Sequence, residues 1–304
     1  MIWDAVLVAG PTAGGKSKLA LALARKFAGT LVNTDSMQVY REARILTARP
    51  DEADIRHAPH RLYGHVGVRE PYSAAHFGTD ASLAYAEARE RGRLPIFVGG
   101  SGLYFSALTR GLANIPPVPD AVRRKVRARR ALLGADAFFA EFAARDPKSA
   151  ARLRASDTQR VLRAAEVLEA SGQSISEWQR VPGSAPLSGA RLARLVLSPT
   201  RSELHRRIDS RFESMIAAGA LDEAASLRGL DPALPAAKIL GLRELWAVLD
   251  GSMDLSAAKA AVKTGTRQYA KRQRTWFRHR MADWTWIEAD ETDAAIEQVL
   301  AQMG

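Results

Sequence analysis

The sequence predicts an α/β fold in which helices flank a parallel sheet, with a small all-helical domain inserted into it. Three observations support this prediction. Short apolar runs that are typical of buried strands alternate with segments of helical periodicity. A glycine-rich turn joins the first apolar run to the first helical segment. Residues 120–180 contain helical segments with no strand-like run between them.

The elements of the core follow in order. The apolar run 5–9 predicts a buried strand, and the residues from 16 to 27 carry leucines at helical spacing. A second strand is expected at 31–35 and a third at 94–98, which leads into a second glycine-rich loop at 99–102. Ligands of parallel α/β sheets bind at the carboxyl ends of the strands, so both loops are candidate site segments.

The middle of the chain departs from this alternation. Three prolines at 116, 117 and 119 cannot lie within a helix, and helical segments follow at about 121–133, 136–145 and 157–171. A strand is expected again at 192–197, then helices to about 280, a strand at 284–288 and a last helix from about 291. We therefore predict a catalytic core of residues 1–115 and 190–304, and a helical insertion of residues 116–189.

Composition limits the possible classes. Of the 304 residues, 47% are hydrophobic and 25% charged, and none is cysteine. This excludes disulfide scaffolds, thiol nucleophiles and cysteine-bound metals. No apolar run approaches the roughly 18 residues of a membrane span, and the first residues lack the basic segment of a secretory signal. We expect a cytoplasmic protein, without a membrane partner.

The charge is strongly positive. Lys and Arg number 44 against 33 Asp and Glu, a net charge of +11, which favours a polyanionic partner such as nucleic acid. Two segments concentrate the basic residues, 121–130 and 267–280. For the first, a solvated helix face is the alternative. In the second, aromatic residues lie among the cations, where they either stack on bases or face the core.

The first glycine-rich turn is a phosphate-binding loop. Residues 10–17 match the pattern G-x-x-x-x-G-K-[ST], between an expected strand and an expected helix, as in P-loop NTPases. Its backbone amides, the lysine and the helix dipole favour phosphate, and the Ser17 hydroxyl suits Mg²⁺. The predicted diphosphate-binding residues in this loop are Gly10, Pro11, Thr12, Ala13, Gly14, Gly15, Lys16 and Ser17.

The acidic residue that accompanies such a loop is displaced. ATP-hydrolysing P-loop proteins usually carry an acid after a second apolar strand, but the run 96–98 ends in glycines. An acid instead follows the strand expected at 31–35, at Asp35. A phosphate loop beside a carboxylate and a hydroxyl suits a diphosphate leaving group as well as it suits phosphoryl transfer.

Several motifs together resemble one family, the tRNA dimethylallyltransferases, also called tRNA isopentenyltransferases. Asp-Ser-x-Gln-Val-Tyr-Arg at 35–41 and the string at 266–278 are its most specific motifs. The others lie at 10–17, 99–104, 157–163 and 238–244. The resemblance implies that a dimethylallyl group moves from dimethylallyl diphosphate to the exocyclic amine of the adenosine 3′ to the anticodon. It also implies Mg²⁺ and a helical insertion that clasps the tRNA anticodon stem–loop.

The resemblance also implies roles for single residues. Asp35 matches the catalytic base, and a turn-capping role is its alternative. Ser101 stands where the family commonly has threonine, and its hydroxyl is expected to bind the bridging oxygen or the amine. Arg206 or Arg211 is expected to reach the diphosphate.

The implied tRNA contacts form four groups. Besides Asp35 and Ser101, they are Ser36, Met37 and Gln38; Arg123; Gln159, Arg160, Val161, Leu162 and Arg163; and Lys271, Arg272, Arg274 and Arg278. The Gln38 amide suits an adenine edge, whereas Met37 also suits a core position. A monomer is expected. Two other functions remain open, a small-molecule or nucleotide kinase and a non-catalytic RNA-binding protein with a regulatory P-loop.

Overall fold

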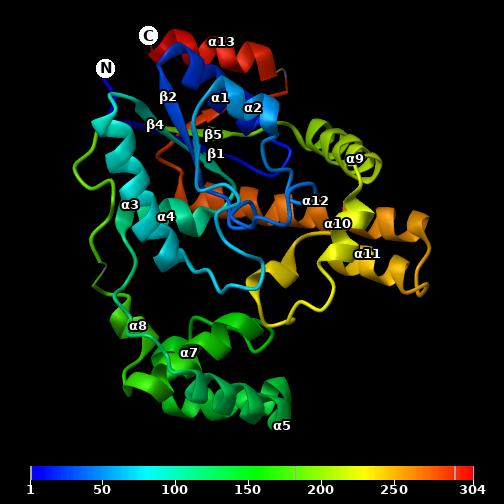
Figure 1. Ribbon diagram of the computed structural model, residues 1–304. Helices are drawn as coiled ribbons and strands as arrows, with labels where there is room; N and C mark the ends of the chain where they lie inside the picture. Colours follow the sequence, from blue (N-terminus) through cyan, green and yellow to red (C-terminus); the bar gives the residue numbers. More distant parts are fainter. Residues whose placement is uncertain (1, 182, 291, 304) are drawn as a thin grey trace. The chain divides into compact units, whose positions relative to one another are not determined.

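The computed structural model describes residues 2–181, 183–290 and 292–303 (Figure 1). The chain divides into two compact units. One comprises the residues up to 109 and from 186 onwards, and the other comprises residues 110–185. The boundaries predicted from the sequence, 116 and 189, lie slightly further along the chain.

Within the described residues, six parallel strands form the sheet of the first unit, in the order β3–β2–β4–β1–β5–β6. They are β1 (Ala5–Ala9), β2 (Gly29–Asn33), β3 (His60–Arg61), β4 (Leu94–Gly99), β5 (Leu192–Leu197) and β6 (Thr285–Ile287). Every residue of β1, β2 and β4 is buried, which explains why these strands are continuous apolar runs in the sequence.

The second strand differs from its prediction. It was expected at 31–35 but ends at Asn33. The Thr34 amide still donates to the Val98 carbonyl of β4, whereas the Asp35 amide donates to the side chain of Asn33. The chain therefore leaves the sheet as a turn that brings Asp35 beyond the end of the strand.

Helices cover both faces of the sheet. Helix α1 (Lys16–Lys26) connects β1 to β2, which lies on the far side of β4 in the sheet. The chain then returns through α3 (Ala74–Glu90) to β4. Since crossover connections are right-handed, this reversal places α1 and α3 on opposite faces. Two short elements precede α3, α2 (Glu52–His57) and β3, and α4 (Gly102–Arg110) follows β4.

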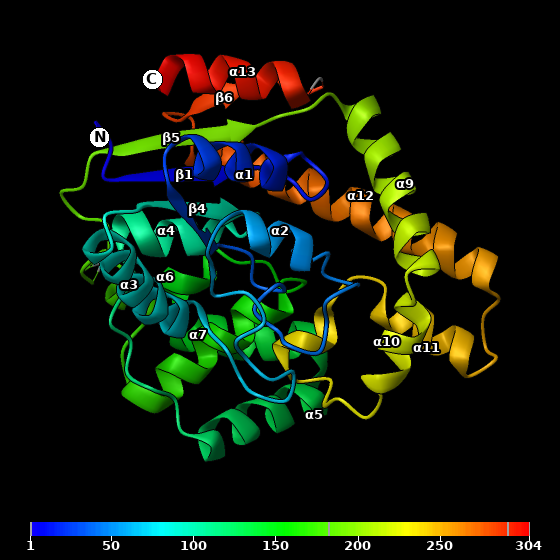
Figure 2. The same cartoon turned by 45° about the horizontal axis from the view of Figure 1, so that its top comes forward.

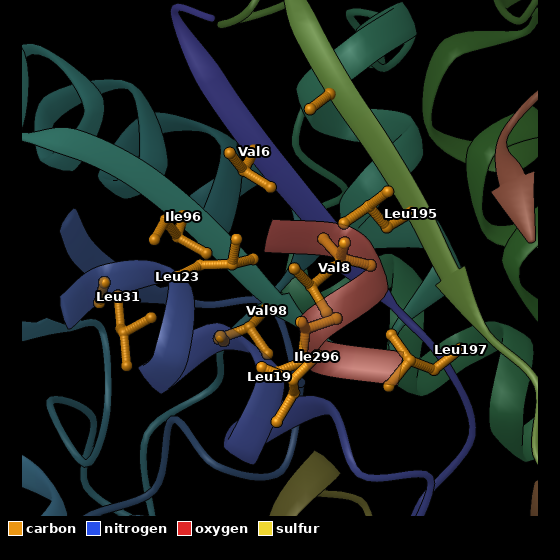
Figure 3. Packing of buried hydrophobic residues seen from close by; sticks show 14 of the residues in the cluster. Val6, Val8, Leu19, Leu23, Leu31, Ile96, Val98, Leu195, Leu197 and Ile296 are labelled. Carbon is orange, nitrogen blue, oxygen red and sulfur yellow. The ribbon is translucent and has the colours of Figure 1, made fainter. Parts of the chain in front are cut away.

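The main core lies under α1 and the last helix, α13 (Thr292–Met303). Figure 3 shows Val6 and Val8 of β1 pointing toward Leu19 and Leu23 of α1, beside Ile296 of α13. Side chains at alternate positions of the same strands are equally buried on the opposite face. This two-sided burial fixes the sheet rigidly, and with it the loops at the ends of its strands.

The remaining helices of this unit lie between β5 and β6. They are α9 (Arg201–Ala217), α10 (Ala220–Ser226), the 3₁₀ helix η1 (Pro235–Lys238), α11 (Leu242–Leu249) and α12 (Leu255–Arg280). Figures 1 and 2 both show α9 lying beside the long α12, as their contacts require. Residues from α10, η1 and α11 form a second apolar cluster with the segment from Val39 to Leu46.

The second unit is helical. Its elements are α5 (Asp120–Arg145), α6 (Pro147–Ala150), α7 (Thr158–Ser171) and α8 (Ile175–Trp178), and its core contains Val126, Phe138 and Phe142. The break expected between 133 and 136 is a kink at Gly134, whose φ of 77° favours glycine. In the described part of the chain, no helix has the length and apolar character needed to cross a bilayer.

Candidate active site

Three loops meet at one edge of the sheet. They follow β2, β4 and β1, which are neighbours in the sheet and run parallel. The loop after β1 is the phosphate-binding loop, the loop after β4 carries Ser101, and the loop after β2 carries Asp35. The chain reverses direction around β1, so this edge is the switch point at which open α/β sheets bind ligands.

The phosphate-binding loop has the tight turn that its glycines predict. The Gly14 amide donates to the Pro11 carbonyl at 3.1 Å, and Gly15 has a φ of 86° directly before α1. Ala13 also has a positive φ, 59°, and packs against Leu204, Ile208 and Ala270 of α9 and α12. The loop is thus held from behind by two helices that are distant from it in sequence.

Lys16 and Arg211 bring two positive charges to this loop. The Lys16 ammonium donates to the Pro11 carbonyl at 2.6 Å. Burial lowers its pKa to about 8; the Asp35 carboxylate opposes this shift and the Arg211 guanidinium adds to it. Burial also lowers the pKa of Arg211, and Asp35 again opposes the shift. Two cations that influence each other's charge and are both partly withdrawn from water form a site for an anion.

The structure distinguishes the two arginines proposed for the diphosphate. Leu204, Ile208 and Arg211 lie on one stripe of α9, because they are four and three residues apart. The first two pack against the phosphate-binding loop, so the stripe carries Arg211 toward it. Arg206 lies off this stripe, is largely exposed and forms an ion pair with Glu203 at 2.6 Å. The geometry therefore favours Arg211.

Asp35 combines a structural contact with a free oxygen. Its Oδ1 accepts a hydrogen bond from the Met37 amide at 2.9 Å, the turn-capping role considered from the sequence. Its Oδ2 has no hydrogen-bond donor among the described residues, and lies 3.4 Å from where a Cβ on Gly100 would stand. The same carboxylate thus fixes its own turn and presents one oxygen to the second glycine loop.

The Ser101 hydroxyl joins the two loops that follow β2 and β4. It accepts a hydrogen bond from the Ser36 amide at 2.8 Å and donates to the Ser36 hydroxyl at 3.1 Å. The strands approach so closely here that a side chain on Gly99 would overlap the Thr34 carbonyl. In this structure the Ser101 hydroxyl therefore serves to hold the two loops together, and its contact with the bridging oxygen or the amine stays a prediction.

Tyrosines surround Asp35, and sequence reasoning missed their role. Burial raises the pKa of Tyr63 and of Tyr269, and the Asp35 charge raises both further. Tyr104 is affected in the same way, with Tyr40 as a stronger influence than Asp35. These phenols therefore stay neutral, and their pKa values show that all three lie within electrostatic reach of Asp35. Tyr63 has no sequence signal, because it follows β3 and reaches the site only through the fold.

Met37 and Gln38 serve the loop itself. Met37 packs against the apolar cluster of α10 and α11, as its core interpretation expects. Both amide hydrogens of Gln38 are used within the loop, in bonds of 2.9 Å to the carbonyls of Thr47 and Ala48. Only its carbonyl oxygen remains to read a base edge.

Glu223 of α10 holds the far end of the same loop, and sequence reasoning did not identify it. Its carboxylate accepts three hydrogen bonds, from the amides of Arg44, Ile45 and Leu46, at 2.8–2.9 Å. A single side chain thereby satisfies three consecutive backbone donors. No local pattern marks this role, since the two segments are far apart in the chain.

The predicted tRNA contacts of the helical unit differ in how far their side chains are exposed. Val161 is only 2% exposed, so its side chain cannot touch RNA directly, whereas Leu162 is partly buried against the same core. Gln159 and Arg160 are exposed and Arg163 is half-buried. On α5, most basic residues pair with acids. These pairs are Arg123 with Asp120, Lys125 and Arg145 with Glu169, Arg127 with Glu166, and Arg129 with Glu141.

A basic hollow in this unit has three arginines, and two of them lack an acidic partner in the part of the chain that the structure describes. It measures about 460 Å³ and is lined by Arg152, Leu153, Arg154, Ser156, Asp157 and Arg160. Arg160 lies 3.5 Å from Asp157, whereas within the described residues Arg152 and Arg154 form no ion pair. Both arginines are exposed. Sequence reasoning named Arg160 alone, because the others lie in a loop whose course it did not predict.

The cations of α12 lie on its outer side. Lys271, Arg272 and Arg278 are exposed, and Arg274 is half-buried. Phe277 is buried, and the Trp276 ring packs so closely on Gly102 that a side chain there would clash with it. The aromatic residues at 276 and 277 therefore serve packing, which is the core interpretation of this segment.

Comparisons with known proteins agree with the family resemblance that the sequence motifs indicate. A family model described as IPP transferase matches residues 38–280. A tRNA dimethylallyltransferase of Nitrobacter hamburgensis is 50% identical over 300 residues, covering 98% of this chain and 94% of that protein. One from Rhodopseudomonas palustris is 51% identical over 296 residues, with 97% and 94% covered.

Solved structures are similar over nearly the whole chain. A tRNA isopentenylpyrophosphate transferase from Bacillus halodurans has a TM-score of 0.69 at 32% identity, covering 98% of this chain and 94% of that one. A eukaryotic dimethylallyltransferase, described as acting on tRNA, has a TM-score of 0.76 at 28% identity, with 95% and 74% covered.

Proposed function

Because this chain belongs to the tRNA dimethylallyltransferase family, we propose that it transfers a dimethylallyl group from dimethylallyl diphosphate to tRNA. The acceptor is the N6 amine of the adenosine 3′ to the anticodon, and diphosphate is released. One observation carries the proposal: the anion site of Lys16 and Arg211 lies within electrostatic reach of the Asp35 carboxylate.

The reaction requires a base and an anion site together. A carbon–nitrogen bond forms between the amine and the allylic carbon, while the carbon–oxygen bond to diphosphate breaks and its electron pair leaves with the oxygen. The amine must lose a proton, which Asp35 accepts through its free Oδ2. Lys16, Arg211 and the loop amides stabilise the charge that grows on the leaving diphosphate.

The surroundings of Asp35 suit an apolar group. The neutral phenols of Tyr63, Tyr104 and Tyr269 all lie within electrostatic reach of this carboxylate, and such rings would help to exclude water around a bound allylic group. A developing allylic cation would otherwise be captured by water, which would waste the donor. Flat aromatic rings also suit a purine that has been flipped out of an RNA loop.

The residues present fit Mg²⁺. Proteins usually hold this ion through one or two oxygen ligands, with substrate phosphates and waters completing the shell. Ser17 is exposed in the first turn of α1 and offers its hydroxyl beside the anion site. When bound, Mg²⁺ would neutralise part of the diphosphate charge. Clusters of three or more His, Cys, Asp or Glu side chains suited to a metal are absent from the described residues.

We assign RNA phosphate contacts to the exposed cations of each unit. In the helical unit these are Arg152, Arg154 and Arg160 of the basic hollow, and in the first unit Lys271 and Arg272 of α12. Arg152 and Arg154 are the best of these candidates, because they form no ion pair within the described residues, whereas Arg160 must first give up Asp157.

The test is a transfer assay with mass spectrometry. Purified protein is incubated with Mg²⁺, dimethylallyl diphosphate and unmodified tRNA, and the tRNA is digested and weighed. We expect one C₅H₈ unit on the adenosine next to the anticodon. A matched reaction with ATP and small acceptors serves as control. Phosphorylated acceptor with unmodified tRNA would show that the protein is a kinase instead.

A further inference from the structure

One buried polar side chain contacts two of the three site loops. Gln273 lies in the middle of α12 and is 6% exposed. Its Oε1 accepts a hydrogen bond from the Thr12 amide of the phosphate-binding loop at 2.8 Å. Its Nε2 donates to the Gly100 carbonyl of the second glycine loop at 2.9 Å. A residue more than 170 positions from either loop therefore connects them.

The two partners determine the orientation of the side-chain amide. A backbone N–H can only donate and a carbonyl can only accept, so the oxygen must face Thr12 and the nitrogen must face Gly100. The carboxamide of glutamine offers both functions on one planar group at every pH. Glutamate in its ionised form has two acceptors and no donor, and leucine has neither.

The space around Gly100 is matched to this side chain. A Cβ on Gly100 would clash with Nε2 of Gln273, and would stand 3.4 Å from Oδ2 of Asp35. The side chain of Gln273 thus packs on one side of the Gly100 backbone, and the Asp35 carboxylate lies nearby. One turn later, the Trp276 ring packs on Gly102 in the same loop. Two neighbouring positions of α12 therefore set the position of this loop.

We propose that Gln273 is a positioning residue that holds the phosphate-binding loop and the Ser101 loop at a fixed separation. This role rests on the proposed transferase function. The diphosphate binds to one loop and the nucleophile approaches along the other, so their spacing decides whether the reacting atoms are in line. Misplacement by about 1 Å is enough to reduce a rate about 100-fold.

The hydrogen bond also removes one donor from the anion site. The Thr12 amide points at Gln273, so it is not available to a phosphate oxygen. Diphosphate is then bound by the later amides of the loop and by Lys16. Loss of the Gln273 oxygen would leave the Thr12 amide free to turn toward the anion, which would change the shape of the cradle.

The first experiment replaces Gln273 with leucine, which has a similar volume and no polar atoms. The matched control is Gln268→Leu, an exposed glutamine on the same helix. We expect Gln273→Leu to weaken the binding of inorganic diphosphate about tenfold by titration calorimetry, and to lower kcat/KM for transfer about 100-fold. Gln268→Leu should leave both unchanged. Thermal unfolding of both variants separates loss of fold from loss of position.

The second experiment uses pH. In Gln273→Glu, a protonated carboxyl restores one donor and one acceptor, whereas the ionised form repels the Gly100 carbonyl. Burial raises the pKa of such a carboxyl, so diphosphate binding by the variant, relative to wild type, should recover between about pH 8 and about pH 5.5. A purely structural defect would not be reversed in this way. This measurement also decides the question if Gln273→Leu does not fold.

Two results would overturn the proposal. One is equal diphosphate binding and transfer by wild type and Gln273→Leu. The other is a Gln273→Glu defect that stays constant with pH. Because diphosphate binding is measured without tRNA, the binding results of both experiments are independent of the transfer assay. A wild-type protein that binds diphosphate but transfers nothing would contradict the proposed function and leave the loop-positioning result readable.

Discussion

Diphosphate binding should be coupled to the uptake of a proton by Lys16. Burial lowers the pKa of this ammonium to about 8 in the free protein. A bound diphosphate places negative charge beside it and raises the pKa again. The anion therefore binds tightly while Lys16 is already protonated, below about pH 8. Above that pH, part of the binding free energy is spent on protonating the lysine.

The magnitude follows from the size of this shift. At about pH 9.5, 1.5 units above the pKa of the free protein, only about 3% of Lys16 is protonated. The affinity for diphosphate should then be about 30-fold lower than at about pH 7, a loss of about 2 kcal/mol. Inorganic diphosphate also loses its own last proton within this pH range, so the contribution of Lys16 is the difference between wild type and Lys16→Arg.

The assay is titration calorimetry in pairs of buffers that differ in ionisation enthalpy. We expect almost no proton uptake at about pH 7, and uptake that approaches one proton per diphosphate at about pH 9.5. Lys16→Arg is the matched control, because arginine stays charged over this range. It should bind with no pH dependence of this kind. Wild-type binding that is flat with pH, without proton uptake, would refute the coupling of Lys16 to the anion.

Three further variants test the other parts of the site. Asp35→Asn should lower kcat about 10²- to 10⁴-fold in the transfer assay and leave diphosphate binding nearly intact. A small loss of kcat would exclude Asp35 as the base. Arg211→Ala should weaken diphosphate binding about 10- to 100-fold, whereas Arg206→Ala should not, and equal losses would contradict the assignment. Arg152→Ala and Arg154→Ala should each weaken tRNA binding and reduce its salt dependence by about one phosphate contact. Filter binding measures this as the slope of log affinity against log salt concentration, and an unchanged slope would exclude both arginines from the RNA contacts.

Most of the fold was predictable because its signals are local. The run at 5–9 and the run at 192–197 form strands with the expected bounds, since strands buried on both faces must be apolar at every position. The kink at Gly134 likewise follows from a residue type. The strand predicted at 31–35 was shifted, because Asn33 captures the Asp35 amide and ends the strand early. That hydrogen bond depends on the turn itself, which no periodicity reveals.

The site shows the same division. The pattern of residues 10–17 identifies an anion site by itself, because backbone amides, a lysine and a helix start are all local features. The choice between Arg206 and Arg211 needed the structure, although the helical stripe of Leu204, Ile208 and Arg211 is visible in the sequence. What the stripe packs against is not visible, and that contact determines which arginine reaches the loop.

The amino-acid sequence by itself identified the phosphate-binding loop, the carboxylate and the helical insertion, and its motifs indicated the family. Only the tertiary structure decided which distant side chains hold these parts in place. Gln273 lies in the motif at 266–278, but its partners, like those of Glu223 and Tyr63, lie on segments far away in the chain and carry no local signal. Hydrogen bonds and burial depend on distances in space, and these are set only when the whole sheet and its helices have packed.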